Sequence, residues 1–124
     1  MDKFTIYGRL DGLNDYTLAN RRNRYAGATM KRKNEELVQY AINTQIPAAR
    51  YSGKVRLHFS WYEPNKKRDK DNICFAKKFI LDALVREGTI SADNWSGIDG
   101  FTDDFYIDKE QPRIEVEITE ALNE

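Results

Sequence analysis

Two aspartates one residue apart, Asp69 and Asp71, stand where a loop is expected to enter a helix. A cluster of cations surrounds them, and it comprises Lys66, Lys67, Arg68 and Lys70. Helix capping explains a single aspartate at such a position, but it does not explain two beside four positive charges. Mg²⁺ typically takes one or two carboxylates together with waters and substrate phosphate. This segment therefore indicates chemistry on a phosphate group assisted by a hard divalent ion.

The residues that follow predict one continuous helix over Asp71–Glu87. At about 100° per residue, Asp71, Lys78 and Asp82 share one polar face, and apolar residues occupy the opposite side. Lys77 lies well off this line, so the helical geometry favours Lys78 as the lysine beside the carboxylates. The alternative is an ordinary surface ion pair between Lys78 and Asp82 at i, i+4.

A third carboxylate, returned by the fold to the start of this helix, would complete an acidic metal site. Four aspartates beyond the helix are candidates, namely Asp93, Asp99, Asp103 and Asp104. Spacing alone does not choose among them, and each can also be read as a surface turn residue. An EF-hand is excluded because Cys74 occupies the loop position that requires glycine. The single histidine, His58, excludes metal sites built on histidine pairs.

The charge of the chain is divided unequally although its formal net charge is zero. Residues 1–70 carry 15 Lys or Arg against 7 Asp or Glu, and the remaining residues carry 5 against 13. Basic clusters with neighbouring aromatic residues suit phosphate backbones and bases, although a solvated surface is the alternative. The candidate DNA-binding residues are Arg21, Arg22, Arg24, Lys31, Arg32, Lys33, Lys66, Lys67 and Arg68.

The length of 124 residues and a hydrophobic share of 40% predict a single domain over residues 1–124. No apolar run approaches the roughly 20 residues that a membrane span needs, and no secretory signal is visible at the N-terminus. One cysteine cannot form an internal disulfide. We therefore expect a cytoplasmic protein without a membrane partner.

Hydrophobic periodicity predicts an α/β (α+β) fold, a small two-layer domain with a mixed sheet of about four strands and two main helices. The expected order is strand, helix, strand, helix, strand, strand. The expected strands are Lys3–Arg9, Lys54–Tyr62, Phe101–Asp108 and Arg113–Thr119, and the first helix runs from about Thr29 to Ile46. Leu10–Arg24 is expected to be an extended loop because it is rich in Asn, Asp, Gly and Arg.

Several of these residues together resemble the RusA family of Holliday-junction resolvases. The resemblance is strongest over residues 68–95, and it rests on Arg68–Ile73, Lys78, Leu81–Leu84, Gly88–Ile90 and Asp93. It implies a small homodimeric endonuclease of bacteria, phages or prophages that binds four-way DNA junctions. Such an enzyme would cut the junction symmetrically with Mg²⁺ or Mn²⁺, in recombination and repair.

Carried over to this chain, the resemblance assigns the metal-binding carboxylates to Asp69, Asp71 and Asp93 and the active-site lysine to Lys78. A metal-activated water would attack the phosphodiester, while Lys78 stabilises the developing charge or assists proton transfer. The segment from Asn72 to Asp82 is a few residues longer than in the best-known members. Many members also have two acids where this chain has Ala92 and Asp93.

The acid absent at Ala92 could be replaced by Asp82, Asp99 or Asp103, and the sequence leaves this choice open. Two other functions also remain open at this point. One is a nuclease of the same scaffold that prefers flaps or other branched DNA. The other is a non-catalytic phage DNA-binding protein in which the acids only cap helices and form ion pairs.

Overall fold

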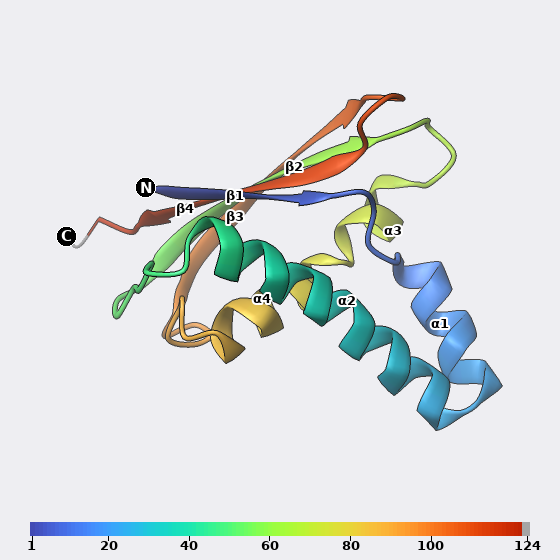
Figure 1. The fold of residues 1–124 in the computed structure, drawn as a ribbon, viewed down its shortest axis with the longest axis horizontal. Helices are drawn as coiled ribbons and strands as arrows, with labels where there is room; N and C mark the ends of the chain where they lie inside the picture. Colours follow the sequence, from blue (N-terminus) through green and yellow to red (C-terminus); the bar gives the residue numbers. More distant parts are fainter. Residues whose placement is uncertain (123–124) are drawn as a thin grey trace.

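A computed structural model describes residues 1–122 of the chain (Figure 1). The four strands are β1 (Asp2–Tyr7), β2 (Val55–Glu63), β3 (Ile98–Ile107) and β4 (Arg113–Glu120). The helices are α1 (Leu13–Arg22), α2 (Arg24–Gln45), α3 (Lys70–Cys74) and α4 (Lys77–Arg86). No helix within the described part of the chain is long and apolar enough to cross a membrane.

The strands form one mixed sheet in the order β1-β4-β2-β3. β4 runs antiparallel to both β1 and β2, whereas β2 and β3 are parallel. The parallel pair is joined by a crossover that contains α3 and α4, as a parallel connection requires. The predicted fold class, a small α+β domain with a four-stranded mixed sheet, is confirmed.

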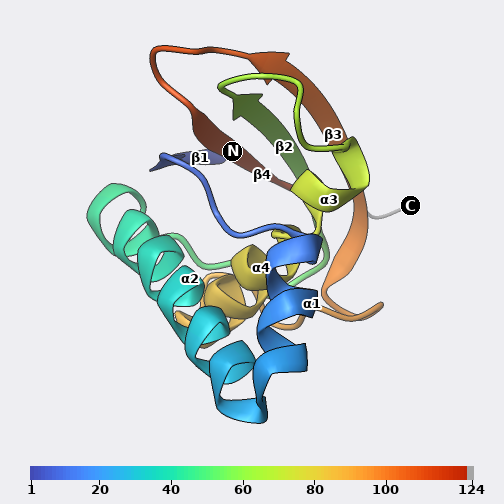
Figure 2. The same cartoon turned by 90° about the vertical axis from the view of Figure 1, so that its right-hand side faces the viewer.

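The helices cover one face of the sheet and leave the other face open (Figures 1 and 2). Alternation along β2 creates this division, because Leu57, Phe59 and Trp61 are each no more than 1% exposed while the residues between them point to the opposite face. Val38 of α2 and Ile80 of α4 are fully buried on the helix side. The core therefore lies between the sheet and the helices, and the site residues must lie around its margin.

The expectation of an extended loop over Leu10–Arg24 is wrong, because residues 13–22 form α1. The Asp15 carboxylate accepts a hydrogen bond from the Gly12 N–H at 2.9 Å, which holds the start of the helix. The Tyr16 ring packs against Phe75 and Phe79 with centroid distances of 5.4 and 6.1 Å. Tertiary packing against a distant helix thus overrides the loop-like composition. Helix α2 also begins earlier than expected, at Arg24.

The helix expected over Asp71–Glu87 is interrupted after Cys74 and resumes at Lys77. The link is tight, since the Ala76 N–H donates to the Ile73 carbonyl and the Lys78 N–H to the Phe75 carbonyl at 3.3 and 3.1 Å. These i→i+3 bonds replace the regular helical pattern over one turn. A uniform rotation of 100° per residue therefore does not connect Asp71 with Lys78, because the two residues lie on separate helices.

Candidate active site

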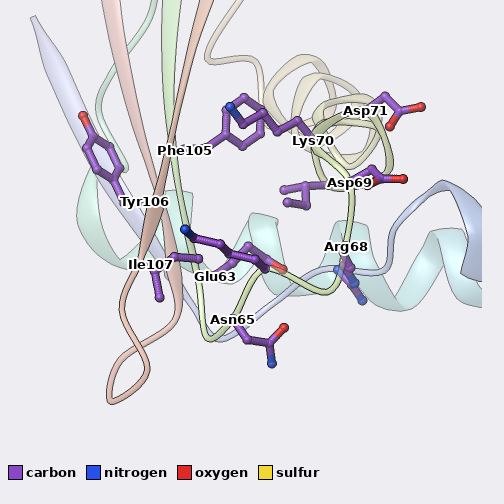
Figure 3. Close-up of a pocket in the computed structure, with 11 residues that line it drawn as sticks. Glu63, Asn65, Arg68, Asp69, Lys70, Asp71, Phe105, Tyr106 and Ile107 are labelled. Carbon is purple, nitrogen blue, oxygen red and sulfur yellow. The ribbon is translucent and has the colours of Figure 1, made fainter.

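Asp69 and Asp71 lie at the start of α3, where the chain arrives from β2. Asp69 has an extended backbone conformation, and its carbonyl accepts the Ile73 N–H at 3.1 Å. Both aspartates are exposed and line a cleft of about 600 Å³. Their side chains point to the same side, away from Phe105 and Tyr106 of β3 (Figure 3). The fold thus brings together the first two predicted carboxylates.

Neither of these carboxylates is neutralised within residues 1–122, where no ion pair involves Asp69 or Asp71. Lys66 and Lys70 line the same cleft, and the Lys70 ammonium lies 5.5 Å from the centre of the Phe105 ring. The unpaired carboxylates could hold a divalent cation, and the ammonium groups that line the same cleft could attract an anionic substrate. The donor set therefore fits Mg²⁺, which needs few protein carboxylates.

Arg68 has a structural role in the same loop. Its guanidinium donates to the Leu10 carbonyl and to the Asp15 carboxylate, both at 3.1 Å. These contacts tie the loop before α3 to the start of α1. Arg68 was predicted to bind DNA, and a guanidinium with two internal partners has fewer donors left for phosphate.

Asp93 lies elsewhere on the same chain. It lines a smaller cleft of about 240 Å³ together with Trp95, Asp99 and Phe101, and this cleft shares no lining residue with the first. Within residues 1–122, no group of three or more His, Cys, Asp or Glu side chains could hold a metal ion. The expected convergence of Asp93 with the other two carboxylates is therefore not formed inside one chain.

The two adjacent lysines of α4 have different surroundings. Lys78 is 55% exposed and lies 3.7 Å from Asp82, which is the surface pair considered as an alternative above. Lys77 is 17% exposed, and its ammonium donates to Asp103 at 2.7 Å. The Trp61 indole N–H donates to the other Asp103 oxygen at 2.8 Å.

Sequence reasoning missed this cluster of Lys77, Asp103 and Trp61. The alternation of Phe101, Asp103 and Phe105 places these side chains on one face of β3, which was a usable signal. The pairing that sets Asp103 beside Phe59 of β2 could not be read from the sequence.

The three candidates to replace the acid absent at Ala92 are all paired with cations. Asp82 lies 3.3 Å from Lys31, Asp99 lies 2.6 Å from Arg56, and Asp103 binds Lys77 as described. None of them joins a metal-binding group among the described residues. The structure therefore gives no substitute for the missing acid within one chain.

The remaining basic residues lie on two separate segments. Arg21 and Arg22 end α1 and Arg24 begins α2, and these helices form a hairpin that projects away from the sheet (Figures 1 and 2). Further along α2 come Lys31, Arg32 and Lys33, and the loop between β2 and α3 carries Lys66 and Lys67. Lys31 pairs with Asp82, which reduces its availability for phosphate.

Cys74, the single cysteine, lies at the end of α3 near these charged groups. Burial raises the pKa of the Cys74 thiol, the Lys77 ammonium opposes this rise, and the Asp103 and Asp71 carboxylates add to it. A raised pKa keeps the sulfur protonated and poorly nucleophilic. Cys74 is therefore a packing residue, and the chemistry of this region depends on its carboxylates and amines.

Comparison with protein families identifies the family of the chain. The family described as "Endodeoxyribonuclease RusA" matches residues 15–119, which is most of the chain and includes Asp69, Asp71, Asp93 and both lysines of α4. The chain belongs to the RusA family. Membership implies an endodeoxyribonuclease of the kind that resolves Holliday junctions. No curated protein matches the RusA-family chain at a significant level.

Proposed function

We propose that this RusA-family chain is a metal-dependent endonuclease that hydrolyses phosphodiester bonds in four-way DNA junctions, using Mg²⁺ or Mn²⁺. The observation that supports this most strongly is the pair of exposed, unpaired carboxylates of Asp69 and Asp71, which line a cleft together with Lys66 and Lys70. Free carboxylates at the margin of a cleft are suited to a cation that is shared with substrate phosphate.

Asp69 and Asp71 would hold the metal ion through their carboxylate oxygens. A bound Mg²⁺ would supply Lewis acidity and a water of lowered pKa. The chain itself positions the two carboxylates through the extended backbone at Asp69 and the first turn of α3. An ammonium group beside the phosphate would stabilise the charge that develops in the transition state. Lys78 stays the residue predicted for this role. Its ammonium lies 3.7 Å from the Asp82 carboxylate.

The third carboxylate, Asp93, would come from a second copy of the chain in a homodimer. β3 is an edge strand that pairs only with β2 among the described strands. Its first residues line the Asp93 cleft, and its last residues line the Asp69–Asp71 cleft. Antiparallel pairing of two β3 strands about a two-fold axis would set each Asp93 cleft beside the other protomer's Asp69–Asp71 cleft.

The edge of β3 has features of an interface. Trp95 is 91% exposed just before the strand, and Tyr106 and Ile107 at its end are 45% and 49% exposed. A ten-residue edge strand with exposed apolar side chains readily pairs with another strand. Two-fold symmetry would also match the two opposing strands that must be cut in a junction.

The basic residues of the α1–α2 hairpin and of the β2–α3 loop would contact the DNA backbone. Arg21, Arg22, Arg24, Lys33 and Lys67 are exposed, so their charges are accessible to phosphate groups. Contacts of this kind position the nucleic acid but do not read its sequence. Binding by them would weaken steeply with added salt. A cytoplasmic location stays a prediction.

A cleavage panel tests the proposal directly. Purified protein would be incubated with a four-way junction, a flap and a linear duplex of matched length, with Mg²⁺, with Mn²⁺ and with EDTA. We expect metal-dependent, symmetric cuts in the junction and little product from the duplex. Preferential cutting of the flap would change the assigned substrate, and the absence of product from every substrate would refute the nuclease activity.

A further inference from the structure

The Lys77 ammonium is held on three sides. It donates to Asp103 at 2.7 Å, and it lies 5.2 and 4.8 Å from the centres of the Phe59 and Phe101 rings. Ring faces attract a cation, and the attraction grows as water is excluded. Because only 17% of this side chain is exposed, its charged end has one well-defined position, unlike an ordinary surface lysine.

The carboxylate that holds Lys77 is itself held. One Asp103 oxygen binds the ammonium, and the other accepts the Trp61 indole N–H at 2.8 Å. Trp61 is 1% exposed, and its ring stacks on Phe59 at a centroid distance of 5.6 Å. The indole is thus part of the rigid core, and it fixes the orientation of Asp103.

This held ammonium lies against β3, the strand whose residues line both clefts. Phe101 lines the Asp93 cleft, and Phe105 lines the Asp69–Asp71 cleft. Asp103 stands between these residues on the same face of β3. Lys77 is therefore anchored midway along the strand that connects the two clefts.

Stability alone is a poor explanation for this arrangement. Ion pairs that are largely shielded from water often contribute little net stability, because desolvation offsets the attraction. Apolar residues of similar volume often replace such a pair without loss of stability. Fixing an ammonium with a carboxylate and a core indole instead resembles the preorganisation that active sites require.

We infer that Asp103 is a positioning residue that holds the Lys77 ammonium for contact with a phosphate oxygen of the bound DNA strand. Trp61 acts indirectly, because its indole N–H fixes the orientation of the Asp103 carboxylate. The inference rests on the proposed nuclease function and assigns to Lys77 the role first predicted for Lys78. Lys77 is the first residue of α4, directly after the break between α3 and α4, and its side chain reaches Asp103 of β3.

Six variants test the inference, each measured for single-turnover junction cleavage, junction Kd and thermal melting. Asp103→Asn keeps the shape of the side chain but removes its charge, whereas Asp103→Glu keeps the charge. Trp61→Phe keeps a ring but removes the indole N–H. The matched control is Glu115→Gln on the open face of the sheet. It also turns a carboxylate into an amide and weakens ion pairs, here with Lys3 at 3.0 Å and Arg113 at 2.8 Å.

We expect Asp103→Asn to cleave about 10- to 100-fold more slowly at saturating protein, as is typical when the support of an active-site group is lost. Its junction Kd should be unchanged. Asp103→Glu should recover most of the rate, Trp61→Phe should show an intermediate loss, and Glu115→Gln should cleave like the wild type. Lys77→Met should lose more activity than Lys78→Met.

Two results would overturn the inference while the nuclease function stands. One is Asp103→Asn cleaving at the wild-type rate, and the other is a loss that Asp103→Glu fails to restore although it melts like the wild type. If Asp103→Asn does not fold, wild-type cleavage by a folded Trp61→Phe variant is the contradicting result. A wild-type protein that cuts no substrate refutes the proposed function itself, and the inference falls with it.

Discussion

Mixing two inactive variants in one dimer tests whether Asp93 acts on the partner's site. The variants are Asp71→Asn and Asp93→Asn, carried on chains with different affinity tags so that the mixed dimer can be purified. In the structure, Asp71 and Asp93 line separate clefts near opposite ends of β3. If the active site is shared, one site of the mixed dimer combines an intact Asp71 with an intact Asp93. The other site carries both substitutions.

The expected magnitude follows from this count of sites. Each mixed dimer should have one working site of two, so its nicking rate per dimer should be about half that of the wild type. A four-way junction labelled on both cleavable strands, resolved on a denaturing gel, would report the cuts. We expect one strand of each junction to be nicked while the opposing strand stays uncut, so that the junction is not resolved.

The same assay can show that the site is not shared between the two protomers. If Asp93 completes the site of its own chain, both sites of the mixed dimer carry one substitution, and no cleavage is restored. A purified mixed dimer that binds the junction but does not nick it would therefore contradict a shared site. Each variant alone should bind the junction normally, which separates loss of catalysis from loss of binding.

Three further predictions concern other features of the chain. Because burial raises the pKa of the Cys74 thiol, its reaction with a thiol reagent at pH 8 should be slower in the folded protein than in denaturant, and should accelerate only at higher pH. Replacing Lys66 and Lys67 together by Ala should weaken junction binding and reduce the slope of log K against log salt by about 2, measured by fluorescence anisotropy. Gly12→Ala should destabilise the fold by roughly 1–3 kcal/mol in chemical denaturation, because the added Cβ would lie 2.5 and 2.8 Å from the side-chain and backbone oxygens of Asn72.

The sheet could be predicted because its strands have one buried face. The alternation in β2, where Leu57, Phe59 and Trp61 are buried, is a local signal that needs no knowledge of the partner strand. The ends of the helices were harder to predict from the sequence. The interruption between Cys74 and Lys77 accompanies the packing of Phe75 against Tyr16, which is remote in sequence.

The candidate site was predictable where its residues are close in sequence. Asp69 and Asp71 are separated by one residue, so their common location followed from the chain itself. The position of Asp93 depends on the direction and length of β3, and the partner of Lys77 depends on strand register. A pattern of one-dimensional spacing contains neither quantity, and the helical face that favoured Lys78 assumed a helix without the interruption after Cys74.

Cleavage of a four-way junction by the wild type and by Asp71→Asn, with and without Mg²⁺, is the decisive test of a metal-dependent site at Asp69 and Asp71. Glu115→Gln serves as the matched carboxylate-to-amide control. We expect the wild type and the control to cut only with the metal, and we expect Asp71→Asn to bind the junction with unchanged affinity but leave it intact. Undiminished cutting by Asp71→Asn, or cutting by the wild type in EDTA, would contradict a metal-dependent site built on these carboxylates.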